Sequence, residues 1–409
     1  DERWRVFFRQ DTVFGVPKAF ACIELLTPLP KSSASNAVLT RLYESLVVDG
    51  LTEPLLYDAQ IAGLVFQLNS SARGIRLFFG GYDDRLVDFA RAVMGALVAF
   101  DPSVDAARFS AQCDVLGREL ESFTSQQPFQ QAGYWTGLAT ARPDFSLQQL
   151  KEALANVKIA DIGAFANRLW KKEPLYGLAL CQGNLREREA DDLIAAIENT
   201  LRFSPLPESD WPLPSVGKVP VRSSGPGCIQ VRDALDPAEE NSAVELSFFL
   251  GTARRADGEA GLKLQAVAQV LSALLRDRFY AELRTKQQLG YVVTSFGDRK
   301  EGVVRLVFIV QGSSLDPVGV LGRIDAFLAQ TRSVLAKGQE GEVQEVASTL
   351  AEARVARAQQ LGEAVERNWA EVRSRELRWD RAMVEADAIR SIRRGDVVEA
   401  FDRFVAVGG

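Results

Sequence analysis

The sequence predicts an α+β protein of two homologous domains, each a mixed, largely antiparallel β-sheet covered by helices. Three observations support this fold class. A proline-rich stretch divides the chain near its middle, one sequence pattern occurs on both sides of it, and each copy alternates amphipathic helices with β-branched strands. We therefore expect a first domain at residues 1–205, a linker at 206–227 and a second domain at 228–409, since domains average roughly 150 residues.

The linker is predicted from its prolines, which stand at positions 205, 207, 212, 214, 220 and 226. Proline lacks a backbone N–H and fixes φ, so it interrupts both helices and sheet ladders. A stretch of this kind is typical of an extended connection between domains.

The internal repeat aligns Leu51–Val65 with Arg278–Val292, and the alignment places Gly63 opposite Gly290. In both copies an apolar helix precedes the glycine. A strand, a second strand containing an arginine and another amphipathic helix follow it. Two copies of one α/β unit explain this order.

The second copy shows the pattern most clearly. Leucine and valine recur every three or four residues from Leu264 to Leu275, which predicts a helix whose apolar stripe faces a sheet. Val303–Val310 is rich in β-branched residues and predicts a strand. We expect this strand to form a hairpin with one that begins at Tyr291, through a turn at Asp298–Gly302.

Composition excludes several classes of function. Hydrophobic residues make up 47% and charged residues 25%, a balance typical of globular proteins. The net charge of -6 and the lack of a basic stripe argue against nucleic acid as a partner. Apolar runs fall short of the ~20 residues that span a bilayer, so we expect no membrane partner. The first residue is Asp1, which suggests a processed or excised piece and leaves localisation open.

The sequence contains no histidine. Ser-His-Asp and Cys-His catalysis and the histidine-based zinc helices are therefore excluded in this chain. Its four cysteines have no short spacing that would suit zinc, so we expect no metal site here. The widely scattered cysteines instead predict buried free thiols.

Several motifs then carry a family resemblance. The segment Leu283–Tyr291, Leu-Arg-Thr-Lys-Gln-Gln-Leu-Gly-Tyr, resembles the signature of the last domain of the insulin-degrading enzyme and pitrilysin family. Phe8–Lys18 resembles the opening of that family's third domain, and Gln127–Tyr134 resembles a helix start within it. Gly183-Asn184 and the stretch Trp369–Arg381 continue the resemblance in order, so it covers essentially the whole chain.

The resemblance implies a four-domain zinc metalloendopeptidase whose two halves close around a chamber. Zinc is then expected in the N-terminal half, which would be the partner of this chain. This chain would be the non-catalytic C-terminal half, inactive alone, which closes the chamber and contacts peptide substrate. The alternative is a catalytically inactive pseudopeptidase or scaffolding subunit, and an inverted zinc motif upstream would distinguish the two.

The resemblance also implies site residues. Arg284 and Tyr291 match the arginine and tyrosine that reach the peptide near the zinc, where both support the transition state by hydrogen bonding. Tyr280, one helical turn earlier, is a weaker candidate for contact with an apolar substrate side chain. We expect Gly290 to end the helix in a left-handed conformation and to direct Tyr291 toward the same space.

A plainer interpretation makes Arg284 a solvated helix charge and Tyr291 the start of an amphipathic strand, which is the commoner role of such residues. The repeat argues against it. The glycine is common to both copies, whereas Tyr57 and Leu64 take the places of Arg284 and Tyr291. A pair needed only for folding would be expected in both copies.

Other features receive structural interpretations. Three acidic pairs could serve as acid–base or hard-metal groups, but adjacent carboxylates point apart and are more typical of turns or helix starts: Asp83-Asp84, Asp191-Asp192 and Glu239-Glu240. Arg254-Arg255 could favour an anion and is expected in a loop between strand and helix. Three tryptophans in helical patterns are expected in the core or at a domain interface: Trp135, Trp369 and Trp379.

Overall fold

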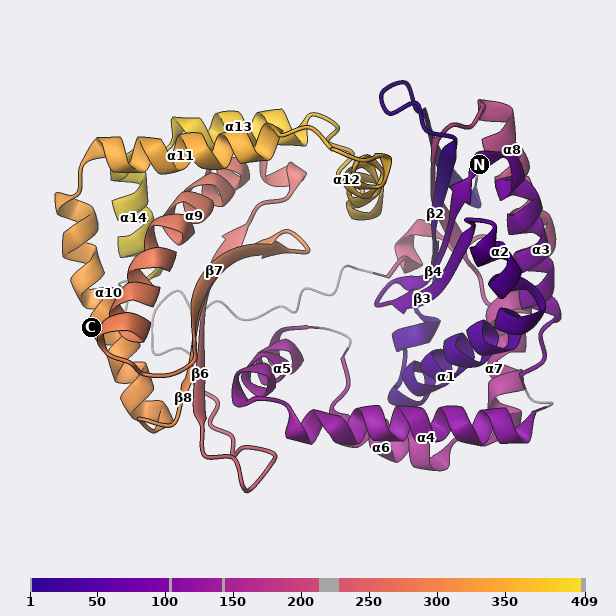
Figure 1. The fold of residues 1–409 in the computed structure, drawn as a ribbon, viewed down its shortest axis with the longest axis horizontal. Coiled ribbons are helices and arrows are strands. Elements are labelled where there is room, and N and C mark those ends of the chain that lie inside the picture. Colours follow the sequence, from indigo (N-terminus) through magenta and orange to yellow (C-terminus); the bar gives the residue numbers. More distant parts are fainter. Residues whose placement is uncertain (1, 103–104, 142–143, 213–227, 406–409) are drawn as a thin grey trace. The chain divides into compact units, whose positions relative to one another are not determined.

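The computed structural model describes residues 2–102, 105–141, 144–212 and 228–405, and Figure 1 shows their helices and strands. The chain forms two compact units, each with its own sheet and hydrophobic core. The first unit comprises Asp1–Ser122, Pro143–Ser215 and Ala358–Leu377. The second unit comprises Phe123–Arg142, Val216–Arg357 and Arg378–Gly409.

The first unit contains a five-stranded sheet in the order β1-β5-β2-β4-β3. β1 runs parallel to β5, and every other pair is antiparallel. The strands are β1 Trp4–Gln10, β2 Lys18–Leu26, β3 Val65–Ser71, β4 Gly74–Tyr82 and β5 Tyr176–Gly183. Central β2 is apolar at nearly every position because side chains cover both of its faces: Ile23 belongs to one buried cluster and Cys22 to another.

Helices cover both faces of this sheet. The larger cluster buries one face against α1, α3, α7 and α8, and α12 covers the other face through Leu361, Val365 and Val372. The helices of the first unit are α1 Ala34–Leu51, α2 Tyr57–Ile61, α3 Leu86–Ala99, α4 Ala106–Ser122, α6 Leu147–Asn156, α7 Ile159–Lys171, α8 Glu187–Leu201 and α12 Leu361–Ser374.

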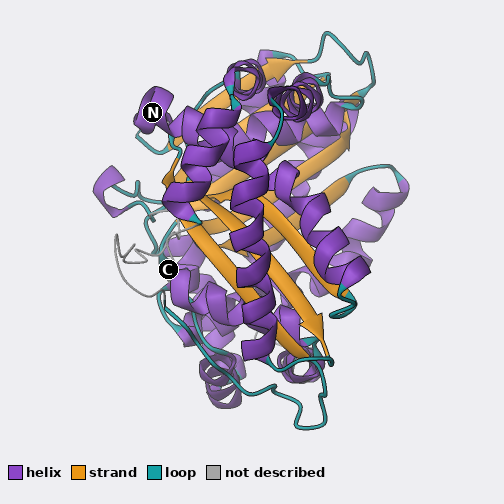
Figure 2. Ribbon diagram, turned by 90° about the vertical axis from the view of Figure 1, so that its left-hand side faces the viewer, coloured by secondary structure: helices purple, strands orange, loops and turns teal. Residues whose placement is uncertain are grey.

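The second unit contains a three-stranded antiparallel sheet in the order β6-β8-β7. Its strands are β6 Ser242–Thr252, β7 Val292–Lys300 and β8 Val303–Gly312. Its helices are α5 Pro128–Thr140, α9 Gly258–Phe279, α10 Pro317–Lys337, α11 Glu340–Val355, α13 Arg381–Ser391 and α14 Arg394–Phe404. Figure 2 shows helices of this unit in front of its strands. The predicted α+β fold class is confirmed, with a mixed first sheet and an antiparallel second sheet.

One helix from each half of the sequence packs on the sheet of the other half. α5, which precedes the proline-rich stretch, contacts β6 and β8, and α12, from the C-terminal half, contacts β2 and β5. The compact units are therefore discontinuous in sequence, whereas the predicted ranges 1–205 and 228–409 are continuous. These ranges stay a prediction for the family domains.

The predicted linker lies partly outside the described residues, which leave out 213–227. Its first part packs against the first unit. Leu206 is buried, and its backbone N–H donates to the Leu175 carbonyl oxygen at 2.9 Å. The Trp211 ring lies 4.2 Å from the Tyr176 ring. Residues 206–212 are thus attached to β5 and its neighbours.

The two units repeat one topology, as the sequence predicts. A strand, a long helix, a hairpin and a second helix follow one another as β2-α1-β3-β4-α3 and as β6-α9-β7-β8-α10. Both long helices widen into a π-helical turn, at Thr52–Leu56 and at Tyr280–Lys286, before the matched glycine. Since π-helical turns are rare, their presence at a similar point of both copies strengthens the evidence for the repeat.

Two local predictions need correction. The hairpin turn is shorter than expected: β7 extends to Lys300, so Asp298 lies in the strand opposite Arg305, and both Arg305 nitrogens Nε and Nη2 donate to its carboxylate. All four cysteines are free, but Cys228 is exposed because it lies in an irregular segment before β6. None of the helices in the described residues combines the length and the apolar composition that a membrane span requires.

Candidate functional site

The candidate site lies where the long helix of the second unit ends and its edge strand begins. α9 continues into the π-helical turn Tyr280–Lys286, and β7 starts directly after Tyr291. Leu283 within the turn is completely buried and anchors it to the core of the unit. Tyr280, at the start of the turn, is exposed, and Arg284, directly after the anchor, is partly exposed.

The structure brings Arg284 and Tyr291 together. The Arg284 guanidinium carbon lies 4.9 Å from the centre of the Tyr291 ring, within cation–π distance. Arg284 Nη1 also donates to the Gly290 carbonyl oxygen at 2.5 Å. Among the described residues, no carboxylate forms an ion pair with Arg284. Since a guanidinium carries five N–H donors, most of them stay available to an acceptor outside the protein.

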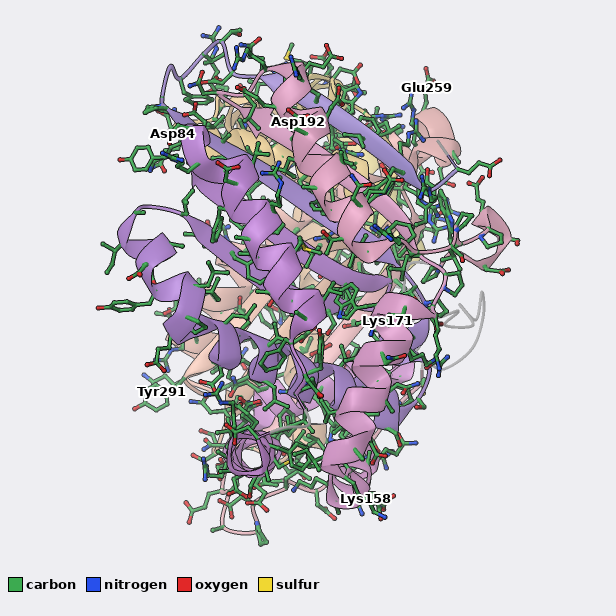
Figure 3. All side chains as sticks on the ribbon, turned by 90° about the vertical axis from the view of Figure 1, so that its right-hand side faces the viewer. Asp84, Lys158, Lys171, Asp192, Glu259 and Tyr291 are labelled. Carbon is green, nitrogen blue, oxygen red and sulfur yellow. The ribbon has the colours of Figure 1, made fainter. Side chains whose placement is uncertain are left out.

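Tyr291 is the most exposed of the large hydrophobic side chains in the described residues, with 87% of its surface accessible. Figure 3 labels Tyr291, whose ring projects away from the ribbon. Tyr280 is 50% exposed, and none of the described contacts joins it to Arg284 or Tyr291. The structure therefore assembles two of the three predicted site residues and places the third nearby on the same turn.

The expected role of Gly290 needs correction. Gln288, with φ of 53°, is the residue in the left-handed conformation, and Gly290 has no positive φ. Position 290 requires glycine for another reason: a Cβ there would lie 1.8 Å from the Gln311 carbonyl oxygen. The close approach of this turn to the end of β8, rather than its dihedral angles, excludes a side chain.

The other two charged side chains of the turn, Glu282 and Lys286, form an ion pair with each other. The Glu282 carboxylate accepts from Lys286 Nζ at 2.9 Å and from Gln287 Nε2 at 3.1 Å. The Lys286 hydrogen bond, followed by that of Gln287, lowers the pKa of Glu282. Because Glu282 is occupied by these partners, it leaves the positive charge of Arg284 unneutralised.

The acidic pairs do not form a metal site. Asp83-Asp84 lies in a short 3-10 helix before α3, and Asp191-Asp192 lies within α8 and is exposed; Figure 3 labels Asp84 and Asp192. Glu239 accepts from the Asn241 backbone N–H at 2.8 Å, which makes it part of a turn. Among the described residues, no group of three or more cysteine or acidic side chains is placed to hold a metal ion.

The other candidates have structural surroundings. Arg254 and Arg255 lie in the loop between β6 and α9, as expected, where the Arg254 backbone N–H donates to Asp257 Oδ2 at 2.6 Å. Trp135 and Trp369 are partly buried in their helices. Trp379 differs from its prediction: it precedes α13 and is 54% exposed.

The two buried cysteine thiols, Cys22 and Cys181, are poor nucleophiles. Burial raises the pKa of Cys22 and of Cys181 to about 12, with smaller contributions from Cys181 and Glu366 at Cys22 and from Asp191 at Cys181. Both thiols therefore stay protonated at neutral pH, and neither lies at the surface.

Sequence reasoning missed one residue of this region, Gln311. It is 6% exposed at the end of β8, and its backbone pairs with Val292, the neighbour of Tyr291. An amide at the end of the apolar run Val303–Val310 was the available signal, because a buried amide requires hydrogen-bond partners.

Two sequence models of protein families match the chain. Residues 1–153 match the "Middle or third domain of peptidase_M16". Residues 270–369, which include the candidate site, match the "PQQ synthase PqqF-like, C-terminal lobe domain 4". The two matches follow the order of the third and fourth domains.

Similar proteins match over most or nearly all of the chain. "Insulin-degrading enzyme-like 1, peroxisomal" from Arabidopsis thaliana is 26% identical over 407 residues, which are 99% of this chain and 41% of that protein. A relative from Schizosaccharomyces pombe, whose name contains the words "zinc protease", is 28% identical over 333 residues, 81% of this chain and 33% of that protein. The chain thus spans about two fifths or less of the length of these relatives.

Among solved structures, the crystal structure of pitrilysin matches with a TM-score of 0.83 and 19% identity over 99% of this chain and 41% of that chain. This likeness shows a shared fold. The two domain matches and the relatives aligned over nearly the whole chain show that the chain is similar to the C-terminal part of peptidases of the insulin-degrading enzyme and pitrilysin family.

Proposed function

We propose that the chain is the non-catalytic C-terminal half of a zinc metalloendopeptidase, which closes the substrate chamber and binds peptide through Arg284 and Tyr291. The observation that carries this proposal is the exposure of Tyr291, 87%, at a position where the first unit buries Leu64 to 7%. A large aromatic side chain gains nothing from folding when it stays in water, so a role in binding accounts for it better than a role in packing.

The chemistry of the pair fits a peptide substrate. The free guanidinium N–H groups of Arg284 can donate to peptide carbonyl oxygens, and the planar group has a fixed geometry for doing so. The Tyr291 hydroxyl can donate to the oxyanion that develops when a peptide bond is hydrolysed. Tyr280 would contact an apolar substrate side chain. Zinc and its ligands belong to the N-terminal half in this proposal, and that half is the partner of this chain.

The test uses the complete peptidase, assembled from this chain and the N-terminal half, with a fluorogenic peptide substrate. Tyr291→Phe keeps the ring and removes the donor, and it should lower kcat by ~100-fold or more, the usual loss for one oxyanion donor. Arg284→Ala should also lower turnover. Neither change should move the melting temperature by more than a degree or two, because neither residue is a core residue.

Tyr57→Phe is the matched control. Tyr57 is 61% exposed and takes the place of Arg284 in the repeat of the first unit. Its loss of a hydroxyl should leave turnover unchanged. Full activity of Tyr291→Phe, or a large loss of thermal stability in Arg284→Ala, would contradict the proposed role. An assembled protein without peptidase activity would favour the pseudopeptidase alternative.

A further inference from the structure

We infer that helix α5 and Gln311 position the Arg284–Tyr291 pair, so that a segment from before the proline-rich stretch supports a site encoded after it. This inference rests on the proposed function of that pair. All of its residues belong to the second compact unit, because α5 packs there.

Gln311 connects α5 to the end of β8. Its side-chain Oε1 accepts from the Phe129 backbone N–H at 2.9 Å, and its Nε2 donates to Gln127 Oε1 at 3.3 Å. Phe129 lies in the first turn of α5, where N–H groups have no partner inside the helix. Gln311 therefore caps a helix that is 182 residues away in the sequence.

The start of α5 is built to receive this cap. Gln127 is the N-cap, Pro128 occupies the first helical position, and Gln130 Oε1 accepts from the Gln127 backbone N–H at 3.1 Å. Farther along, α5 lies close to β6, since a Cβ at Gly133 would be 3.2 Å from a Glu245 carboxylate oxygen. The helix thus packs against the same sheet that carries Gln311.

The backbone of Gln311 in turn supports the site. Its residue pair in the sheet is Val292, directly after Tyr291. The Gly290 backbone rests against the Gln311 carbonyl so closely that neither Gly290 nor Gly312 has room for a Cβ: the nearest backbone oxygens would lie at 1.8 and 1.9 Å. Gly290 O holds the Arg284 guanidinium, which covers the Tyr291 ring. A displacement of β8 at Gln311 therefore moves the arginine and the tyrosine together.

The loss of the Gln311 amide should consequently impair catalysis through Tyr291 and not merely lower stability. Leucine has a size similar to that of glutamine and cannot cap α5. In the complete peptidase, Gln311→Leu should therefore lower kcat about tenfold and change KM by less than about twofold. The larger effect is expected on kcat because small displacements of an aligned catalytic group are costly. Gln265→Leu is the matched control: Gln265 is a 5% exposed amide of α9 whose Nε2 donates to Glu385. It should lower the melting temperature without this loss of kcat.

A double-mutant cycle with Tyr291→Phe provides the decisive measurement. If Gln311 acts through the Tyr291 hydroxyl, Gln311→Leu should cost little more kcat once that hydroxyl is absent. Equal fold losses in both backgrounds, or no loss in either, would overturn the inference and leave the proposed function standing. No effect of Tyr291→Phe alone would overturn both.

A second variant keeps the test valid if Gln311→Leu does not fold. Gln127→Ala removes the acceptor of Gln311 Nε2 at an exposed helix N-cap. It should lower kcat severalfold, and again only when Tyr291 is present. An equal loss in the Tyr291→Phe background would count against the inference.

Discussion

The two units contain the same turn between a long helix and a strand, but they differ in the residue that follows the glycine of that turn. In each, a long helix widens into a π-helical turn, passes a glycine and enters the strand at the edge of a sheet. The first unit then buries Leu64, whereas the second exposes Tyr291 beneath the Arg284 guanidinium. The shared parts belong to the fold, and the parts that differ are the candidates for function.

The glycines show how one requirement can have two causes. Gly63 has φ of 78°, and a Cβ there would meet the Tyr82 side chain at 2.7 Å. Gly290 has no positive φ but lies against the backbone of Gln311. A side chain such as Tyr82 can rotate away from an added methyl group, whereas a strand backbone cannot.

The largest effect is therefore expected from Gly290→Ala. It should destabilise the unit by about 3 kcal/mol or more, because the added methyl group forces two backbone segments apart, and it should abolish turnover of the complete peptidase. Gly63→Ala should cost about 1 to 2 kcal/mol, from its left-handed conformation, and preserve turnover. Thermal unfolding and peptide cleavage measure both. Equal stability losses would remove the distinction between the two turns.

An exchange of the residues that follow the glycines should give an intermediate effect. Leu64→Tyr places a larger, polar-tipped ring in a site that is 7% exposed and should destabilise the protein by about 1 to 3 kcal/mol. Tyr291→Leu should change stability by less than about 0.5 kcal/mol, because the side chain is solvated. Chemical denaturation of the two variants tests this asymmetry. A substantial loss for Tyr291→Leu would mean that the tyrosine contributes to packing.

The last difference concerns the long helices and depends on pH. Burial raises the pKa of Glu44 on α1 from its ordinary value of 4.5 to about 7, and a hydrogen bond from Ser70 offsets only part of this. One of its carboxyl oxygens is buried without a hydrogen-bond partner. The buried residues of α9 include no acidic side chain. Between pH 4.5 and about 7, Glu44 is therefore protonated in the folded state and ionised in the unfolded state.

Glu44 should therefore destabilise the first unit as the pH rises from about 4.5 to about 7, with no further loss above that. Glu44→Gln should remove this dependence and raise the melting temperature at pH 8 relative to the parent. At pH 4 the two proteins should have closely similar stability. An unchanged pH profile in the variant would show that Glu44 is not the group responsible.

The sequence predicted the repeated α/β unit because helix and strand periodicities depend on local burial, which the pattern of apolar residues records. It also pointed to Arg284 and Tyr291, by resemblance and by their absence from the first copy, and their role stays a prediction. It did not predict that α5 packs on the sheet of the second unit and α12 on the sheet of the first. Periodicity identifies the apolar face of a helix but not the sheet that covers this face. The prediction that Gly290 adopts a left-handed conformation was wrong for a similar reason. The close approach of its backbone to that of a residue distant in sequence leaves no local signal.

The order of helices and strands, the duplication and the family resemblance were thus determined by the amino-acid sequence alone. Only the tertiary structure decided that Tyr291 is exposed while Leu64 is buried, and that Gln311 caps a helix from the other half of the sequence. Local preferences act over a few residues along the chain. Exposure and capping depend on which segments meet in space, because solvent and hydrogen-bond partners are excluded or supplied by residues far away in sequence.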